Sequence, residues 1–168
     1  MEQVIALVPL AAVEPEAVDA LLDRAFGPER RTRTAYRIRS GSLPVPEMSF
    51  AALDSDGSLL GTIQCWPVAL ACDHGAAVPL VMVGPVAVEP GRQQGGIGRA
   101  LMERMLDAVP GCAAPGCDAL MLIGDPDYYG RFFGFTADRT ARWNAGCHCN
   151  IVRSRSRARL SASLPSNA

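Results

Sequence analysis

Four glycines lie within residues 91–98, in the stretch GRQQGGIG. Glycine has no Cβ, so this turn can adopt positive φ and a ligand can approach its backbone amides closely. Apolar residues then recur at four-residue spacing, at Ile97, Leu101 and Met105, as on the buried face of an amphipathic helix. Because the first amides of a helix lack intrahelical acceptors and lie at the positive end of its dipole, the stretch predicts a site for an anion such as phosphate.

The segment before this turn predicts a strand over residues 78–88. Val86 and Val88 are β-branched and alternate with smaller residues, which favours a strand with two unlike faces. Pro90 ends the pairing because it has no amide proton to donate. Gly84-Pro85 interrupts the strand and indicates a bulge or a splayed end, where backbone amides leave the ladder.

Two tyrosines, Tyr128 and Tyr129, begin the aromatic segment YYGRFFGF of residues 128–135. A tyrosine hydroxyl can act as a general acid in proton transfer. The segment 127–132 predicts a short helix, with Gly134 as its stop. The alternative interpretation is that both tyrosines only pack over a cofactor.

The remaining elements must position this turn and this aromatic helix. We expect a first strand at 2–9, a helix at 14–26, a hairpin formed by 48–53 and 59–68, and a short buried strand at 119–123. The segment 29–40 reads as a second, basic helix. Its five arginines favour a solvated helical face, or alternatively a surface that meets an anionic cofactor tail or substrate: Arg30, Arg31, Arg33, Arg37 and Arg39.

Composition excludes several function classes. The 168-residue chain has a formal net charge of -1, which gives no general attraction to nucleic acid or to anionic membranes, and no apolar run reaches the roughly 20 residues of a membrane helix. It contains no lysine, which excludes a Schiff-base lysine and a phosphate-loop lysine. The apolar N-terminus has no basic leader, so the sequence predicts a cytoplasmic protein.

Six cysteines in such a chain predict reduced thiols rather than a disulfide framework. Cys65 and Cys117 have no neighbouring histidine in sequence, which favours buried structural cysteines over acyl carriers. Cys147-His148-Cys149 offers three metal ligands, but the spacing is not that of a zinc knuckle. We therefore expect no metal.

Taken together, the strand VGPVAVEP, the turn RQQGGIG, the helix GRALMERML and the segment GDPDYYGRFFGF resemble the GCN5-related N-acetyltransferase (GNAT) family. The run Gln93-Gln94-Gly95-Gly96-Ile97-Gly98 fits the family's acetyl-CoA signature, Q/R-x-x-G-x-G/A. The final segment is similar to that of a bacterial subgroup of acetyltransferases that closes with GDP-x-YY-x-RFGF. The resemblance covers Val4 to about Trp143.

Two other glycine-rich motifs do not match this sequence. Arg99 stands where a phosphate loop needs lysine, and Leu101 stands where a dinucleotide fingerprint needs a small residue.

The resemblance implies an α/β fold of the GNAT acyl-CoA N-acyltransferase type, with a mixed, mostly antiparallel sheet splayed between its fourth and fifth strands and helices on both faces. It implies a domain over 1–143, followed by a divergent Arg/Ser-rich tail at 144–168. The implied cosubstrate is acetyl-CoA, with its pyrophosphate on the turn and its pantetheine beside the strand. The implied binding residues are Val86, Ala87, Val88, Gln93, Gln94, Gly95, Gly96, Ile97, Gly98, Arg99 and Ala100.

The family chemistry implies direct transfer of acetyl to a primary amine. By analogy, the Val86 amide would stabilise the oxyanion, and Tyr129, or else Tyr128, would protonate the departing thiolate. Tyr129 lies five residues before Gly134 rather than the usual four, and one extra residue rotates a helix by about 100°. The general base is left open: four titratable residues are candidates, and ordered water could do the same work. The candidates are Glu47, Asp73, His74 and Glu89.

The tail NAGCHCNIVRSRSRAR replaces the apolar strand pair with which the subgroup finishes its sheet, so we expect no good last strand. An acceptor pocket left incomplete in this way would be supplied by a partner subunit in a homodimer. The expected substrate is a small-molecule or peptide amine. The alternative is a CoA-binding sensor or assembly module of the same fold that does not catalyse.

Overall fold

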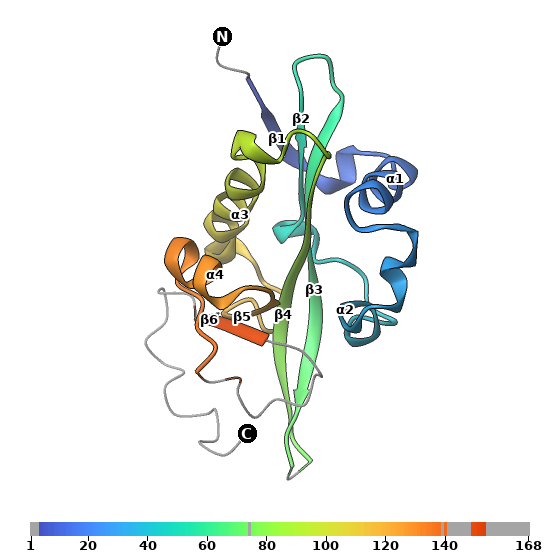
Figure 1. Ribbon diagram of the computed structural model, residues 1–168. Coiled ribbons are helices and arrows are strands. Elements are labelled where there is room, and N and C mark those ends of the chain that lie inside the picture. Colours follow the sequence, from blue (N-terminus) through green and yellow to red (C-terminus); the bar gives the residue numbers. More distant parts are fainter. Residues whose placement is uncertain (1–3, 74, 139, 141–148, 154–168) are drawn as a thin grey trace.

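The computed structural model describes residues 4–73, 75–138, 140 and 149–153. A single sheet has the strand order β1-β2-β3-β4-β5-β6, in which β4 and β5 are parallel and the other neighbours are antiparallel (Figure 1). The strands are β1 (Ala6–Pro9), β2 (Phe50–Leu53), β3 (Leu59–Ala71), β4 (Ala77–Val88), β5 (Ala119–Ile123) and β6 (Cys149–Arg153). This mixed sheet confirms the predicted fold class.

Helices cover both faces of the sheet (Figure 1). The α-helices are α1 (Pro15–Phe26), α2 (Thr34–Ile38), α3 (Ile97–Ala108) and α4 (Pro126–Phe133). The 3-10 helices are η1 (Leu10–Ala12), η2 (Pro28–Thr32), η3 (Pro46–Met48), η4 (Gln93–Gly95) and η5 (Val109–Gly111). The predicted basic helix over 29–40 is therefore two short helices, since Arg33 has extended backbone angles between them.

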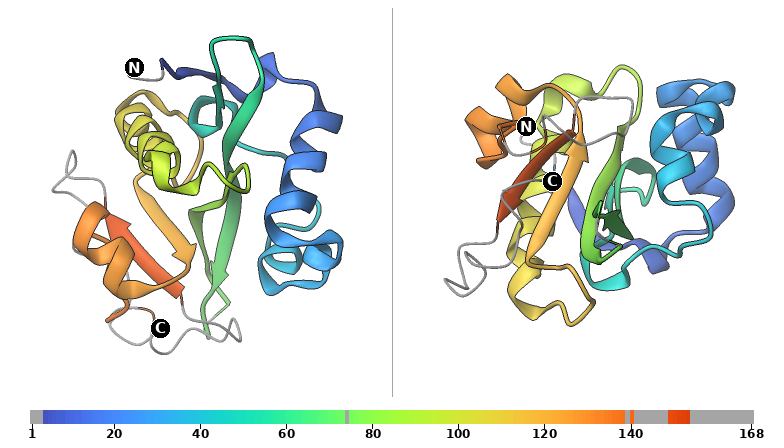
Figure 2. Two further views of the ribbon diagram at one scale, coloured as in Figure 1. Left: turned by 45° about the horizontal axis from the view of Figure 1, so that its top comes forward. Right: turned by 90° about the horizontal axis from the view of Figure 1, so that it is seen from below.

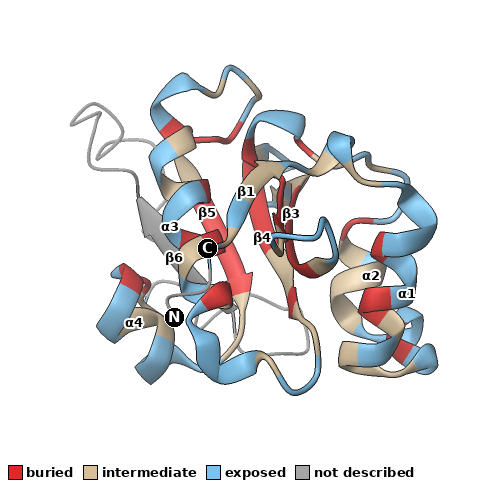
Figure 3. Cartoon of the chain, turned by 90° about the horizontal axis from the view of Figure 1, so that it is seen from above, coloured by how far each residue is buried: buried red, intermediate tan, exposed pale blue. Residues whose placement is uncertain are grey.

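The apolar faces predicted for α1 and α3 are the buried ones. Val18, Leu21 and Leu22 of α1 pack against Ala87 of β4. On the other face, the inward side chains of α3 join the largest core cluster, which also contains Phe133 and Phe135 from the aromatic segment. Figure 3 shows buried residues concentrated on the central strands and on the helix faces that cover them. The helix bearing the glycine turn is thus fixed against the sheet.

The tail contributes a strand, which corrects the expectation that the sheet lacks a good last one. β6 pairs antiparallel with β5, from Ala119↔Arg153 to Ile123↔Cys149, and lies beside it in Figure 2. Backbone pairing supplies these contacts whatever the side chains, so a divergent sequence can still complete a sheet. Residues 147 and 148, the side chain of Cys149 and residues 154–168 lie outside what the structure describes.

Two cysteines differ from the predicted reduced state. A disulfide joins Cys112 and Cys117, whose Cα atoms lie 6.2 Å apart because the loop after η5 turns back on itself. The sequence showed both cysteines in one Gly/Pro-rich loop but not how that loop closes. Cys65 and Cys72 are free and buried.

Within the described residues, no helix combines the length and the apolar character needed to cross a membrane.

Gly61 of β3 allows α3 to approach the sheet closely. A Cβ built at Gly61 would lie 2.9 Å from both the Ala87 carbonyl oxygen and Ile97 Cγ2. Gly61→Ala should therefore lower the free energy of unfolding by about 2 kcal/mol through overpacking. Gly111→Ala is the matched control, because its Cβ would meet nothing within 4 Å, and should cost less than about 0.5 kcal/mol. Urea denaturation measures both, and equal midpoints for the two variants would contradict this packing.

Candidate active site

The sheet splits between β4 and β5. The two strands pair only at Val81↔Leu120 and Met82↔Met121, although β4 continues to Val88 (Figure 2). Gly84 and Pro85 follow the last pair, and the register between β3 and β4 shifts at the same level, between Ile63 and Cys65. The splayed end predicted from Gly84-Pro85 is confirmed. Beyond Met82, the edge of β4 that faces β5 makes no ladder with it.

The glycine turn ends in an uncapped helix start. Gly96 is the N-cap residue of α3, with φ of 72°, and no side chain caps the helix. The Ala100 amide donates to the Gly96 carbonyl at 2.9 Å, so the amides of 97–99 are the first-turn donors that lack an intrahelical acceptor. Gln93, Gln94, Gly95 and Gly96 are exposed. The turn therefore presents backbone donors to solvent.

The turn lies directly beside β4. A Cβ on Gly98 would lie 3.5 Å from Val88 Cγ2 and 3.8 Å from Val86 Cγ1. The structure thus brings the predicted strand residues together with the predicted turn residues. The side chains of Ala87 and Ile97 are buried in the core, so these two residues can offer only backbone groups. Arg99 is exposed and bonds Glu103 through Nε at 2.9 Å.

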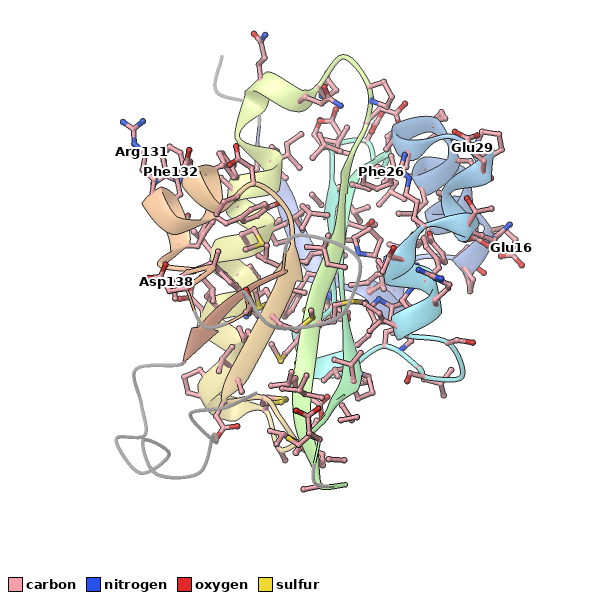
Figure 4. All side chains as sticks on the ribbon, turned by 60° about the horizontal axis from the view of Figure 1, so that its bottom comes forward. Glu16, Phe26, Glu29, Arg131, Phe132 and Asp138 are labelled. Atoms are coloured by element: carbon pink, nitrogen blue, oxygen red, sulfur yellow. A yellow bond between two sulfur atoms is a disulfide. The ribbon has the colours of Figure 1, made fainter. Side chains whose placement is uncertain are left out.

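A cavity of about 360 Å³ lies between the split strands and the segment from α1 to α2. At one end it is lined by Gly84, Pro85, Val86 and Tyr129, and at the other by residues of α1, η2 and α2. Figure 4 shows Phe26, which also lines the cavity, on the side of α1 that faces β4. The full lining is Phe26, Arg30, Arg33, Thr34, Ala35, Tyr36, Arg39, Met82, Val83, Gly84, Pro85, Val86, Met102, Leu122, Ile123 and Tyr129.

Tyr129 faces this cavity, whereas Tyr128 does not line it and is 43% exposed. The ring of Tyr129 packs over Gly124, where an added Cβ would lie 2.5 Å from Cε2. Asp125 caps the start of α4 by accepting from the Asp127 amide at 3.0 Å, and Gly134 ends the helix with φ of 74°. The five-residue spacing to Gly134 therefore does not turn Tyr129 away from the cavity.

Burial raises the pKa of Tyr129 above its ordinary value, with smaller contributions from Tyr128 and Asp125. The hydroxyl accordingly keeps its proton through neutral pH and can donate it. Burial also raises the pKa of the Cys65 thiol, which disfavours the nucleophilic thiolate. Cys117 is held in the disulfide. Neither cysteine has the properties of an acyl carrier.

The residues predicted as possible bases do not meet at the cavity. Glu89 forms an ion pair with Arg24 at 2.8 Å, and Glu47 and Asp73 are exposed. His74 lies outside the described residues. Among the residues that the structure describes, none of these lines the cavity, and no group of three metal-ligating side chains is found. None of the described candidates is therefore placed to act as a general base at the cavity.

Sequence reasoning missed the burial of two arginines, Arg30 and Arg39, which are 1% and 6% exposed. The interpretation of 29–40 as a solvated face is wrong for these two. Arg30 donates to Asp23 Oδ1 at 2.7 Å and to Asp19 Oδ1 at 2.8 Å, and it bonds the Tyr36 hydroxyl. The acidic residues of α1 were the available signal, since they offer this arginine a partner.

The arrangement of a split sheet above a glycine turn is that of the GNAT acyl-CoA N-acyltransferase fold. Residues 9–136 match the family described as acetyltransferase (GNAT) domain, so the chain belongs to that family. In sequence, it has no significant match among curated proteins.

Solved structures share this fold. The GNAT family N-acetyltransferase YhbS from Escherichia coli, in complex with CoA, is 25% identical with a TM-score of 0.64, and the match covers 91% of this chain and 82% of that one. A GCN5-related N-acetyltransferase from Kribbella flavida is 18% identical with a TM-score of 0.54. That match covers 80% of this chain but only 33% of the Kribbella protein.

The raised pKa of Tyr129 predicts a pH dependence of stability. The folded chain holds this proton to higher pH than the unfolded chain, so the resulting stabilisation is complete below about pH 10 and is lost as pH rises through the folded pKa. Tyr129→Phe removes the effect. In urea denaturation, the wild type should lose stability relative to Tyr129→Phe above about pH 10. A constant difference between the two proteins across that range would contradict the assignment.

Proposed function

We propose that this protein is an acetyl-CoA-dependent N-acetyltransferase that transfers acetyl directly to a primary amine. The observation that carries the proposal is the continuity of the site. The uncapped start of α3, the unpaired edge of β4 and the Tyr129 side chain follow one another along the split in the sheet. Each supplies a group that acetyl transfer from a thioester needs.

The residues present fit coenzyme A. The amides of Gln94 to Ala100, at the positive end of α3, suit its pyrophosphate. The edge of β4 over Val86–Val88 suits the amides of its pantetheine arm, which would run along it like an added strand. The E. coli relative is in complex with CoA, which supports the same cosubstrate here.

In the proposed reaction, the amine nitrogen attacks the thioester carbonyl carbon and the carbon–sulfur bond then breaks. The Val86 amide donates to the carbonyl oxygen and stabilises the negative charge that develops on it. Tyr129 gives its proton to the departing sulfur. The attacking amine loses its extra proton to water, since no carboxylate is found among the described lining residues.

The finer assignments belong to the same proposal. The segment GDPDYYGRFFGF supports the bacterial subgroup that closes with this motif. We take residues 1–143 as the catalytic domain and 144–168 as a tail that supplies β6. The proposed protein is cytoplasmic, uses no metal and binds no nucleic acid or membrane. Its acceptor is a small-molecule or peptide amine. The homodimer expected from a missing last strand loses that ground, because β6 is present.

The second candidate is a CoA-binding module that does not catalyse. The observation that favours it is the absence of a carboxylate or histidine among the described residues lining the cavity. The five-residue spacing between Tyr129 and Gly134 does not support the non-catalytic candidate, because the Tyr129 side chain reaches the cavity. The two candidates differ in what the Tyr129 hydroxyl does.

Replacing each tyrosine by phenylalanine separates these candidates. With acetyl-CoA and a panel of amines, Tyr129→Phe should lower kcat for thiol release about 100-fold, because the general acid is lost. The KM for acetyl-CoA should not change. Tyr128→Phe is the matched control, and its exposed side chain should leave kcat within about twofold.

The non-catalytic candidate gives the opposite pattern. In that case CoA binds, no amine in the panel raises thiol release above background, and Tyr129→Phe changes nothing.

A second pair of variants tests the phosphate site. A Cβ at Gly98 would make only ordinary van der Waals contacts, so Gly98→Asp is compared with Gly98→Asn, which has nearly the same shape without the charge. The aspartate would place a negative charge at the start of α3 and repel the pyrophosphate. By calorimetry, the Kd for CoA should rise at least about tenfold more in Gly98→Asp than in Gly98→Asn. Equal values would place the pyrophosphate elsewhere.

A further inference from the structure

The cavity beside Tyr129 is lined by positive charge. Arg30, Arg33 and Arg39 come from η2, its C-cap and the C-cap of α2, and no aspartate or glutamate is found among the described lining residues. A cavity built only for a simple cationic amine would place carboxylates here, because opposite charges attract at close range. The lining favours a ligand that carries negative charge.

The three arginines differ in how their charges are balanced. Arg30 has two carboxylate partners, Asp19 and Asp23. Arg33 donates to the Phe26 carbonyl at 3.0 Å and lies over the Phe26 ring. Arg39 is the most unusual, because it is 6% exposed and forms no ion pair within the described chain.

Arg39 is held between two aromatic rings. Its Cζ lies 3.8 Å from the centroid of the Tyr36 ring and 4.3 Å from that of the Trp66 ring. Nη1 is buried without a hydrogen-bond partner in the described part of the chain. Burial lowers the pKa of Arg39, although a guanidinium stays charged in proteins. Tyr36 and, more weakly, the Asp19 carboxylate oppose this lowering of the pKa, but no carboxylate among the described residues forms an ion pair with Arg39.

A second donor near this guanidinium is also unsatisfied. The indole Nε1 of Trp66 is buried without a partner among the described residues. Trp66 does not line the cavity beside Tyr129. It lines a further cavity of about 250 Å³ together with Gln64 and Asp19, and Arg39 lines both cavities. Buried polar groups in native proteins are nearly always hydrogen-bonded, so unpaired ones indicate a place for an ordered water molecule or a ligand.

The position of Arg39 restricts the anion. Because the side chain is buried, a membrane surface or a nucleic acid backbone cannot reach it, whereas a compact group on a small molecule can enter the cavity. The phosphates of CoA have their own place at the start of α3. The remaining candidate is an anionic group on the amine substrate itself.

We propose that the acceptor is an amine that also bears an oxyanion group, either carboxylate or phosphate, and that Arg39 and Arg33 bind this group. The proposal rests on the proposed function and names its substrate class. The oxyanion occupies the basic end of the cavity, so the amine extends toward Val86 and Tyr129. A guanidinium binds carboxylate or phosphate through two parallel hydrogen bonds, which orients the substrate as well as holding it.

The apolar part of the cavity helps the chemistry. An ammonium placed among Val86, Met102 and Leu122 loses hydration, which disfavours its protonated form and lowers its pKa. The amine can therefore become neutral and nucleophilic through water, without a carboxylate base. This accounts for an acyl-transfer cavity whose described lining contains arginines and no acid.

Matched acceptors test the charge requirement in the full chain. We would compare phenylalanine with phenylalaninamide, alanine with alaninamide, and O-phosphoethanolamine with ethanolamine, by thiol release from acetyl-CoA. At least one anionic member should show a kcat/KM at least tenfold above its neutral partner. The first two pairs report on carboxylate and the third on phosphate. Equal or higher values for every neutral member would overturn the proposal.

Variants of Arg39 test which residue binds the anion. Arg39→Gln should raise the KM for the preferred acceptor at least tenfold while the KM for acetyl-CoA stays unchanged. Arg37→Gln is the control, because Arg37 lies in the last turn of α2, two residues before Arg39, is exposed and does not line the cavity. Arg39→Lys keeps the charge but cannot form two parallel hydrogen bonds to the anion, so it should raise the acceptor KM less than Arg39→Gln does. It is the variant to measure if Arg39→Gln fails to fold.

A binding measurement separates this proposal from the proposed function. In a Trp143→Phe background, Trp66 is the remaining tryptophan of the two in the chain. N-acetylphenylalanine should change its fluorescence saturably, N-acetylphenylalaninamide should not, and Arg39→Gln should abolish the response. If this response occurs but no amine is acetylated, the anion site stands and the acetyltransferase function fails.

Two other results overturn the anion site. One is a loss of acetyl-CoA affinity in Arg39→Gln with the acceptor KM unchanged, which would assign Arg39 to the cosubstrate. The other is the absence of any Trp66 response both to N-acetylphenylalanine and to N-acetyl-O-phosphoethanolamine.

Discussion

The candidate site depends on the loss of pairing between β4 and β5 after Met82. Two residue pairs join the parallel strands, and after them, at Gly84 and Pro85, β4 is no longer paired with β5. The split does two things at once. It leaves a strand edge with backbone groups that a ligand can use, and it opens the space into which Tyr129 projects. A fully paired sheet would provide neither.

The surrounding elements hold the two sides of this split in place. Gly61 brings α3 close to β3, so the glycine turn lies against Val86 and Val88. On the opposite side, α1 packs on Ala87, and the Arg24–Glu89 ion pair links its C-terminal turn to the residue that follows β4. The tyrosine-bearing helix packs into the same core as α3. The elements that carry the proposed cofactor and proton-donor groups therefore share one core.

The predictable parts of this site are those encoded locally. The spacing of Ile97, Leu101 and Met105 was sufficient to give the buried face of α3, and Gly84-Pro85 was sufficient to give the split. The orientation of Tyr129 could not be settled in this way, since it depends on how the ring packs over Gly124.

The unpredicted features arise from side-chain and backbone contacts that form only when the chain folds. Arg39 is buried because Trp66, from another element, covers it. Arg30 is buried because α1 supplies Asp19 and Asp23. The pairing of β6 with β5 and the closure of the Cys112–Cys117 loop are likewise set by tertiary structure. A charge pattern along 29–40 carries no information about such partners, so a solvated helix and a binding surface look alike in sequence.

Hydrogen–deuterium exchange of the full chain with and without CoA tests the central claim most directly. If CoA lies along the split, amides in residues 83–100 become protected on binding, because the turn and the β4 edge gain acceptors. The described residues between β3 and β4, which are 72, 73, 75 and 76, should exchange unchanged. Protection confined to other segments, with 83–100 unaffected, would contradict the account.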